Sequence, residues 1–295
     1  MISGHYSNYL CQLFTLLAEY DTLYLNLNRL IEMTYFFTGC AIAVYLFAFG
    51  YQASRLRQHH NLPTAAFQWM TALAIALHSA AIFGFQLESE GMDLSLFKIC
   101  ALISLVINVV LFFSGLKKPI HSLFLFLFPI SALSLLAAMV TPSTKAAVVI
   151  PANIEAHVLV SILAYSILAI AALQALLIGY QNWQLKHKHQ NLLMRTFPPL
   201  QSMEALLFEL VWAGEILLTL SLASGFMFYD DLFSQQLIHK VAFSIVAWVF
   251  YGCLLWGRHF KGWRGNTAIR WTWAGFIAIL LGYIGSKVVL EFILV

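Results

Sequence analysis

Three of the ten histidines fall within apolar segments or at the start of one, where leucine would cost less free energy than imidazole. They are His78 in ALAIALHSAAIFG, His157 in NIEAHVLVSILAYS and His239 in LIHKVAF. A neutral imidazole in such a place either donates a lone pair to a metal or forms a hydrogen bond to a neighbouring helix. The other seven are expected in loops, at span ends or in the N-terminal tail: His5, His59, His60, His121, His187, His189 and His259.

Imidazoles without a cysteine cluster suit haem iron better than zinc or copper. The four cysteines form neither a CxxC nor a CxxCH pattern, which argues against a thiol relay and against a c-type cytochrome. We therefore predict that His157 and His239 are axial ligands of a haem b, and that His78 is an alternative or second-site ligand. A site for a bare metal ion, with Glu155 and Asp231 as further ligands, is the open alternative.

Haem also carries two propionates, which bind cations. Lys240 is adjacent to His239, and Lys287 lies in the apolar sequence GYIGSKVVLEF, so both are predicted propionate partners. Lys287 has two alternative roles, because it could extend to the membrane surface or pair with Glu291 four residues later.

Two acids, Glu209 and Glu215, are embedded in the apolar sequence ALLFELVWAGEILLTL. Carboxyl groups inside a membrane are costly and often functional, so each is either a proton site or a partner for a polar group on another helix. In a proton-coupled transporter, these acids and His78 would relay protons. Small residues in the same segment predict a helix-packing face: Gly214, Ser221 and Gly225.

The elements that position these residues must be membrane helices. Of the 295 residues, 61% are hydrophobic and only 10% are charged, and apolar runs of membrane-spanning length recur from residue 33. Backbone groups in lipid need internal partners, which helices provide. The prediction is an all-α bundle of eight transmembrane helices, at residues 33–51, 64–86, 95–115, 120–140, 153–181, 205–228, 238–257 and 268–293.

Charge in the loops predicts the orientation of this bundle, because short cytoplasmic loops collect Lys and Arg. Eleven of the 16 basic residues fall in alternate predicted loops: Arg55, Arg57, Lys117, Lys118, Lys186, Lys188, Arg195, Arg258, Lys261, Arg264 and Arg270. Both termini are then outside the cytoplasm. His78, His157 and His239 all fall in the outer half, with His78 about 12 Å and His157 about 6 Å below the surface.

The chain is divided into an external N-terminal segment, residues 1–32, and the eight-helix domain, residues 33–295. Residues 9–18, YLCQLFTLLA, are too short to cross a bilayer, and an interfacial helix is one interpretation of them. Walker, Rossmann and HExxH patterns are absent. The slightly basic net charge reflects membrane topology, so nucleic acid is not an expected partner.

Several segments together resemble a known family. They are AHVLVSILAYSILAIAALQALL at 156–177, PPLQSMEALLFEL at 198–210, FSIVAWVFYGCLLWGRHFKGWRG at 243–265 and LHSAAIF at 77–83. Their order and spacing are similar to those of the cytochrome c assembly family, the CcsA and HemX type, especially its small YpjD-like bacterial inner-membrane members. The resemblance covers roughly residues 34–293.

The resemblance implies a haem-handling protein of the bacterial inner membrane, with haem and another membrane or cytochrome-assembly protein as partners. The family's external histidine before the long middle span corresponds to His157. Its WxWDPKE motif falls where this chain has Leu237–Val241, and only Lys240 matches. Because the tryptophans and the aspartate of that motif are missing, we expect no haem lyase activity and lean against an enzyme. A proton-coupled transporter and a non-catalytic membrane scaffold are the alternatives.

Overall fold

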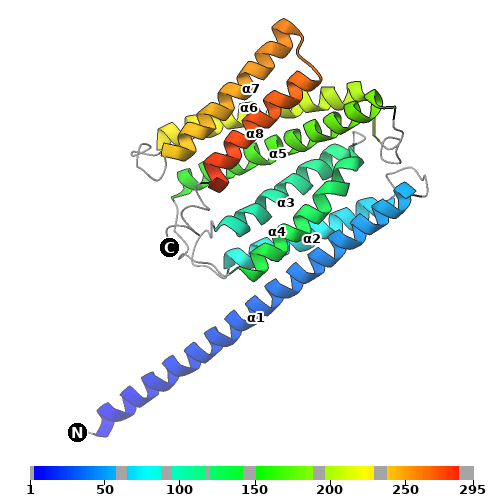
Figure 1. Ribbon diagram of the computed structural model, residues 1–295. Helices are drawn as coiled ribbons and strands as arrows, with labels where there is room; N and C mark the ends of the chain where they lie inside the picture. The colour runs from blue at the N-terminus through cyan, green and yellow to red at the C-terminus, as the bar shows by residue number, and fades with distance from the viewer. Residues whose placement is uncertain are drawn as a thin grey trace.

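The protein is all-helical over the part of the chain that the structure, a computed structural model, describes (Figure 1). That part is residues 3–57, 65–87, 95–116, 120–141, 151–188, 197–228 and 238–285, with side chains of the first helix described from residue 28 to 55. The helices are α1 Ser3–Arg57, α2 Ala65–Leu87, α3 Leu96–Gly115, η1 His121–Leu123, α4 Phe124–Val140, α5 Ala152–Lys186, α6 Leu200–Phe228, α7 Ile238–Lys261, α8 Asn266–Leu280 and the π-helical turn η3 Leu281–Gly285. The predicted all-α class is confirmed for these ranges.

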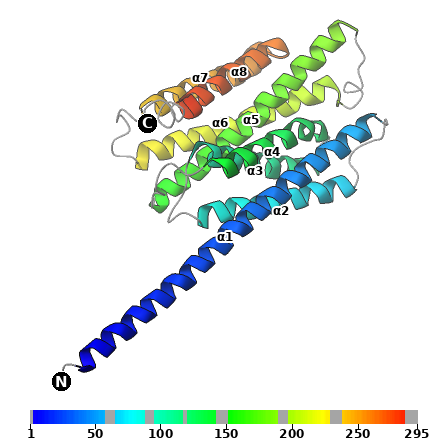
Figure 2. The ribbon, with the colours of Figure 1, turned by 60° about the horizontal axis from the view of Figure 1, so that its bottom comes forward.

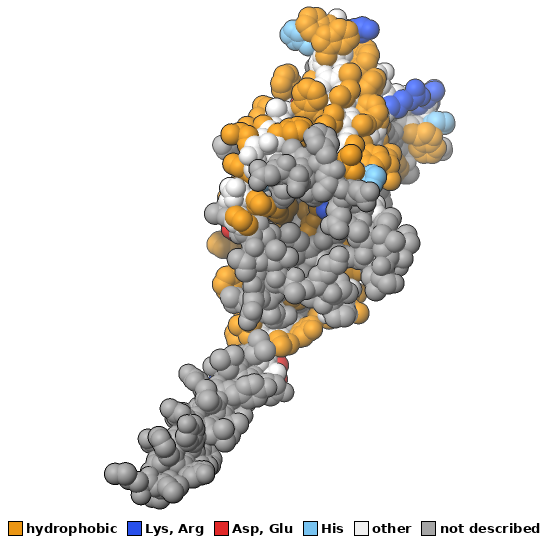
Figure 3. All heavy atoms as spheres, turned by 90° about the vertical axis from the view of Figure 1, so that its left-hand side faces the viewer, with side chains coloured by type: hydrophobic (Ala, Val, Ile, Leu, Met, Phe, Trp, Pro, Cys, Tyr) orange, Lys and Arg blue, Asp and Glu red, His pale blue; other side chains and the backbone are white. Residues whose placement is uncertain are grey.

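Among the described residues, seven helices are long and apolar enough to cross a membrane, and they coincide with the first seven predicted spans. The predicted eighth span, 268–293, is represented by α8 and η3, which end at Gly285. Residues 286–295 lie outside the described part, so an eighth crossing stays a prediction. Large apolar side chains such as Phe36, Trp69 and Met227 are exposed on the bundle, as expected for a surface in contact with lipid. Figure 3 shows many hydrophobic side chains in the upper part of the molecule.

The bundle consists of two groups of four helices. In the first group α1 packs on α2 and α4, and α3 packs on α2 and α4; in the second, α5 packs on α6 and α8, and α7 packs on α6 and α8. The two groups meet where α3 packs on α5, which Figures 1 and 2 show from two sides. Side chains at this junction therefore come from both halves of the chain.

Helix α1 is much longer than a membrane crossing. Its 55 residues correspond to about 80 Å of helix, of which residues 28–55 form the apolar span. The N-terminal half extends away from the other helices in both ribbon views. Residues 9–18 are part of this continuous helix, and the division at residue 32 falls inside it.

Helices α5 and α6 pack closely through small residues. Gly214 faces the side chain of Leu168, and Ser221 Oγ lies 2.7 Å from Ser161 Oγ. A Cβ added to Gly225 would come within 3.1 Å of His157 Cε1. The predicted packing face at 214, 221 and 225 is confirmed, since all three residues are buried against α5. The fit of α6 on α5 fixes the place of His157.

Candidate functional site

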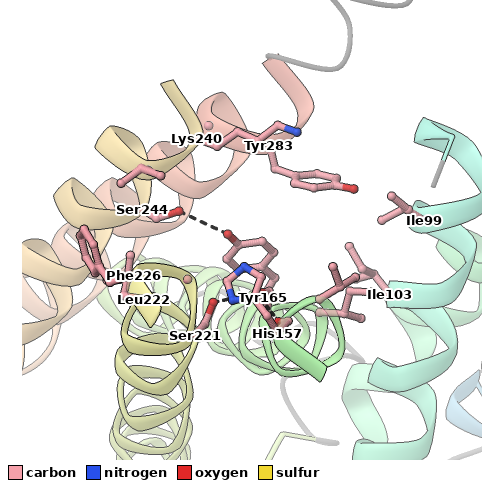
Figure 4. Close-up of a pocket in the computed structure, with 16 residues that line it drawn as sticks. Ile99, Ile103, His157, Tyr165, Ser221, Leu222, Phe226, Lys240, Ser244 and Tyr283 are labelled. Atoms are coloured by element: carbon pink, nitrogen blue, oxygen red, sulfur yellow. Dashed lines mark hydrogen bonds between the residues drawn. The ribbon is translucent and has the colours of Figure 1, made fainter. Parts of the chain in front are cut away.

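A cavity of about 240 Å³ opens at the junction of the two helix groups (Figure 4). Helices α3, α5, α6 and α7 and the turn η3 all contribute to its wall. One part of the wall is apolar, with Ile99 and Ile103 from α3 and Phe226 from α6. Another part carries the predicted site residues His157 and Lys240. A cavity with an apolar wall and a few polar groups is the usual form of a site for a cofactor or small molecule.

The imidazole of His157 is oriented by a hydrogen bond to α6. Its Nδ1 lies 2.9 Å from Ser224 Oγ, and the hydroxyl of Ser224 donates its single proton to the backbone carbonyl of Ser221 at 2.9 Å. With the Ser224 proton on that carbonyl, Ser224 accepts at His157, and Nδ1 carries the proton and donates it. The lone pair of this ring is then on Nε2. A histidine that ligates a metal through Nε2 is oriented by this kind of Nδ1 hydrogen bond.

Hydroxyl groups continue the polar side of the cavity along α5. Ser161 and Tyr165 follow His157 at intervals of four residues, so all three lie on one face of the helix. Ser161 Oγ donates to the carbonyl of His157 at 2.7 Å, and Tyr165 OH lies 3.3 Å from Ser244 Oγ on α7. Sequence reasoning missed these residues, although polar side chains four residues apart in an apolar helix are a usable signal.

Lys240 lines the cavity from the first turn of α7, and Figure 4 shows its side chain beside Tyr283. Its Nζ lies 5.7 Å from the centre of the Tyr283 ring. Tyr283 and Gly282 belong to η3, and a Cβ on Gly282 would come within 2.7 Å of Phe243 Cβ. Glycine at 282 lets η3 pack on α7, which brings Tyr283 to the cavity, and single π-helical turns often occur at functional sites.

These residues fit the requirements of a haem. His157 supplies a neutral imidazole, Lys240 supplies a cation in the same cavity, and the wall formed by α3 is apolar. Glycine at 225 avoids a close contact with the His157 ring, because a Cβ at this position would lie 3.1 Å from Cε1. Such a set of groups would provide one iron ligand, one propionate partner and apolar contact for a porphyrin.

The structure does not bring the other predicted ligands to this cavity. His239 is exposed and does not line the cavity, because adjacent residues in a helix point about 100° apart and Lys240 faces the cavity. Lys287 lies outside the described residues. Glu155 is exposed, Asp231 is outside the described part, and within that part no group of three or more His, Cys, Asp or Glu residues could hold a metal ion.

His78 lies elsewhere, in the core of the first helix group. It is fully buried, and its Nδ1 is 3.0 Å from Tyr45 OH on α1. The two rings meet edge to face, and Tyr45 also contacts the ring of Phe128 on α4. Nε2 is buried on the side of the Ala101 carbonyl without a hydrogen bond of good geometry. In this arrangement His78 connects α2 to α1.

Replacing Tyr45 with Phe tests this structural role. The variant removes the hydroxyl and leaves His78 Nδ1 without its partner, so we expect a loss of about 1–3 kcal/mol in the free energy of unfolding. Thermal unfolding in detergent measures the change, with Tyr35→Phe on the exposed side of α1 as the matched control. An unchanged midpoint in Tyr45→Phe would show that the hydrogen bond contributes nothing to the stability of the fold.

The two acids of α6 have different surroundings. Glu209 is exposed and lines a second cavity, of about 230 Å³, toward the N-terminal end of α6. Glu215 is 8% exposed, its Oε2 is buried without a hydrogen-bond partner among the described residues, and its Oε1 faces Gly252 of α7. Neither acid lines the cavity that holds His157.

Comparisons with known proteins agree with the resemblance seen in the sequence. The model of the family described as cytochrome C assembly protein matches residues 13–294. The inner membrane protein YpjD of Escherichia coli K12 is 32% identical over 229 residues, which cover 75% of this chain and 85% of that protein. A cytochrome c biogenesis protein CcsA of Prochlorococcus marinus MIT 9215 is 28% identical over 87 residues, 29% of this chain and 28% of that protein.

An uncharacterized 28.8 kDa protein of Azospirillum brasilense is 31% identical over 143 residues, which cover 48% of this chain and 53% of that protein. No solved structure matches the chain. The apolar helices and the similarity to an inner membrane protein identify a multi-pass protein of the bacterial inner membrane. Because the family model matches nearly the whole length, the chain belongs to the cytochrome c assembly protein family.

Proposed function

We propose that this protein binds haem b non-covalently in the cavity between the two helix groups, with His157 as an iron ligand. The observation that carries the proposal is the shared cavity of His157 and Lys240, in which Ser224 fixes the imidazole with its lone pair on Nε2. Haem, when bound, would supply an iron centre that can carry an electron or be passed to an acceptor protein.

The residues of the chain would bind and orient this group. His157 Nε2 would offer its lone pair to iron, Lys240 would offer a cation to a propionate, and the apolar residues of α3 would exclude water from the porphyrin. By the distribution of basic residues, we propose that both termini and the His157 end of the bundle face away from the cytoplasm. The cavity would then present its ligand on the outer side of the inner membrane.

We propose that the protein handles haem without attaching it to a cytochrome. Among its relatives, the protein from Prochlorococcus is named for cytochrome c biogenesis, which supports a link to haem. Attachment requires an outer platform for the acceptor, and Leu237–Val241 lacks the tryptophans and aspartate found there in the haem-attaching relatives. Haem, lipid and a further membrane or cytochrome-assembly protein would be its partners.

An absorption spectrum of gently purified protein tests the proposal. A Soret band together with a pyridine haemochrome spectrum of haem b supports it, and extraction of the haem into acidic acetone shows that the bond is non-covalent. Protein that lacks a Soret band as purified, and that gives no saturable spectral change when haem is added, would contradict the proposal.

Replacing Lys240 with Gln is expected to weaken haem binding without removing the iron ligand. Loss of a charge-assisted contact to a propionate predicts an affinity about 10-fold to 100-fold lower, with the Soret maximum unchanged. Haem titration measures this loss, and Lys186→Gln, at the exposed opposite end of α5, is the control. Equal haem affinities of Lys240→Gln and the wild-type protein would show that Lys240 does not contribute to haem binding.

A further inference from the structure

The turn between α7 and α8, with the adjoining ends of the two helices, carries exposed basic side chains at the end of the bundle away from the haem cavity. Lys261, Arg264 and Arg270 are exposed, and residues 256–272 contain no Asp or Glu. Figure 3 shows basic, histidine and hydrophobic side chains together at the top of the molecule, where Figure 1 places this turn. The proposed haem function does not use any of these residues.

The backbone of this turn is fixed by hydrogen bonds to α6 and α7. Trp263 N donates to the carbonyl of Gly257 at 3.1 Å, and Arg258 Nη1 donates to the carbonyl of Trp263 at 3.2 Å. Gly265 N donates to Glu204 Oε1 on α6 at 2.9 Å, with Gly265 at a φ of 57° that favours glycine. These hydrogen bonds therefore fix the backbone of the turn from which the basic side chains project.

Gly257 of α7 is the residue against which Trp263 of the turn packs. A Cβ at this position would overlap the ring of Trp263, so only glycine lets the indole pack against the helix. The ring of Trp263 also stacks on Trp271 of α8, with centroids 5.4 Å apart. Packing of this tryptophan joins α7, the turn and α8 into one unit.

Aromatic side chains accompany the cations. Lys261 Nζ lies 5.2 Å from the centre of the Trp256 ring and 5.9 Å from that of Trp263. Trp256 is 51% exposed and Phe260 is 68% exposed, as expected for side chains at the boundary between lipid tails and headgroups. Arg258 has a different role, because its guanidinium lies 4.5 Å from the Phe208 ring and supports the turn.

We propose that this turn binds the phosphate of an anionic phospholipid headgroup, with Lys261 and Arg264 as its charged contacts. Phosphate oxygens accept several charge-assisted hydrogen bonds, and a turn at the bilayer boundary meets headgroups directly. A zwitterionic lipid carries its own cation next to the phosphate, so it gains less from this cluster. The proposal is independent of haem binding.

The test compares two pairs of charges. Detergent-purified full-length protein is titrated with short-chain phosphatidylglycerol, with short-chain phosphatidylcholine and with inorganic phosphate, and binding is followed by thermophoresis. We compare the wild-type protein, Lys261→Gln with Arg264→Gln, and Lys186→Gln with Lys188→Gln. The control pair removes the same charge from exposed residues at the C-terminal end of α5.

We expect saturable binding of phosphatidylglycerol only. The affinity for this lipid should fall by about tenfold or more in the double variant of Lys261 and Arg264 and should change little in the control variant. A third variant, Gly257→Ala, keeps every charge but displaces Trp263, and it should also bind more weakly. Equal losses in the two pairs, equal binding of phosphatidylcholine, or equally tight binding of inorganic phosphate would overturn the proposal.

Discussion

Haem is expected to be lost from the protein when His157 is replaced with alanine. The imidazole is the predicted iron ligand in the cavity, and removal of even a supporting hydrogen bond typically costs a metal site 10-fold to 100-fold in affinity. Loss of the ligand itself should cost more than about 100-fold. Haem content after purification, and a haem titration of the apoprotein, measure the effect.

A graded set of variants separates ligation from damage to the fold. Ser224→Ala removes one hydrogen-bond partner of Nδ1 and keeps the imidazole, so its haem affinity should fall between those of the wild-type protein and His157→Ala. His259→Ala, on the exposed end of α7, is the histidine control. His239→Ala distinguishes the two predicted ligands. If it loses haem while His157→Ala keeps it, the iron is held outside the cavity and the assignment of His157 is wrong.

The membrane helices were predictable because the bilayer imposes a simple rule. Apolar runs must be about 20 residues long, so the first seven spans could be placed within a few residues from hydropathy alone. The extent of α1 was not predictable in this way. Residues 3–27 continue the helix without an apolar run of membrane-spanning length. Hydropathy indicates contact with lipid, whereas continuation of a helix depends on its backbone hydrogen bonds.

The site was only partly predictable, because its chemistry depends on which helices meet. The sequence indicated His157 and Lys240 as candidates, but it could not show that Ser224 on another helix orients the imidazole. Adjacency in sequence does not place His239 and Lys240 in the same cavity. They share a helical turn and yet point in different directions, so the structure brings only Lys240 to the cavity.

The packing of α5 on α6 suggests the second large effect. A Cβ at position 214 overlaps the side chain of Leu168, which is fully buried. The larger side chain in Gly214→Val should therefore overpack this interface. Overpacking of this kind costs about 1–3 kcal/mol, and we expect the midpoint of thermal unfolding to fall by roughly 5 °C. Differential scanning fluorimetry in detergent measures the shift, with haem content as a second readout, since His157 lies on the same helix interface.

Gly39→Val is the matched control for this prediction. Gly39 is exposed on α1, and a Cβ at this position has no atom within 4 Å. The control should leave the midpoint unchanged or raise it, because valine has a higher helix propensity than glycine. If both variants shifted the midpoint equally, the cost would come from valine in a membrane helix and not from the α5 and α6 interface. A fall seen in Gly214→Val alone would show that the close approach of these two helices, which sets the position of His157 against Gly225, stabilises the fold.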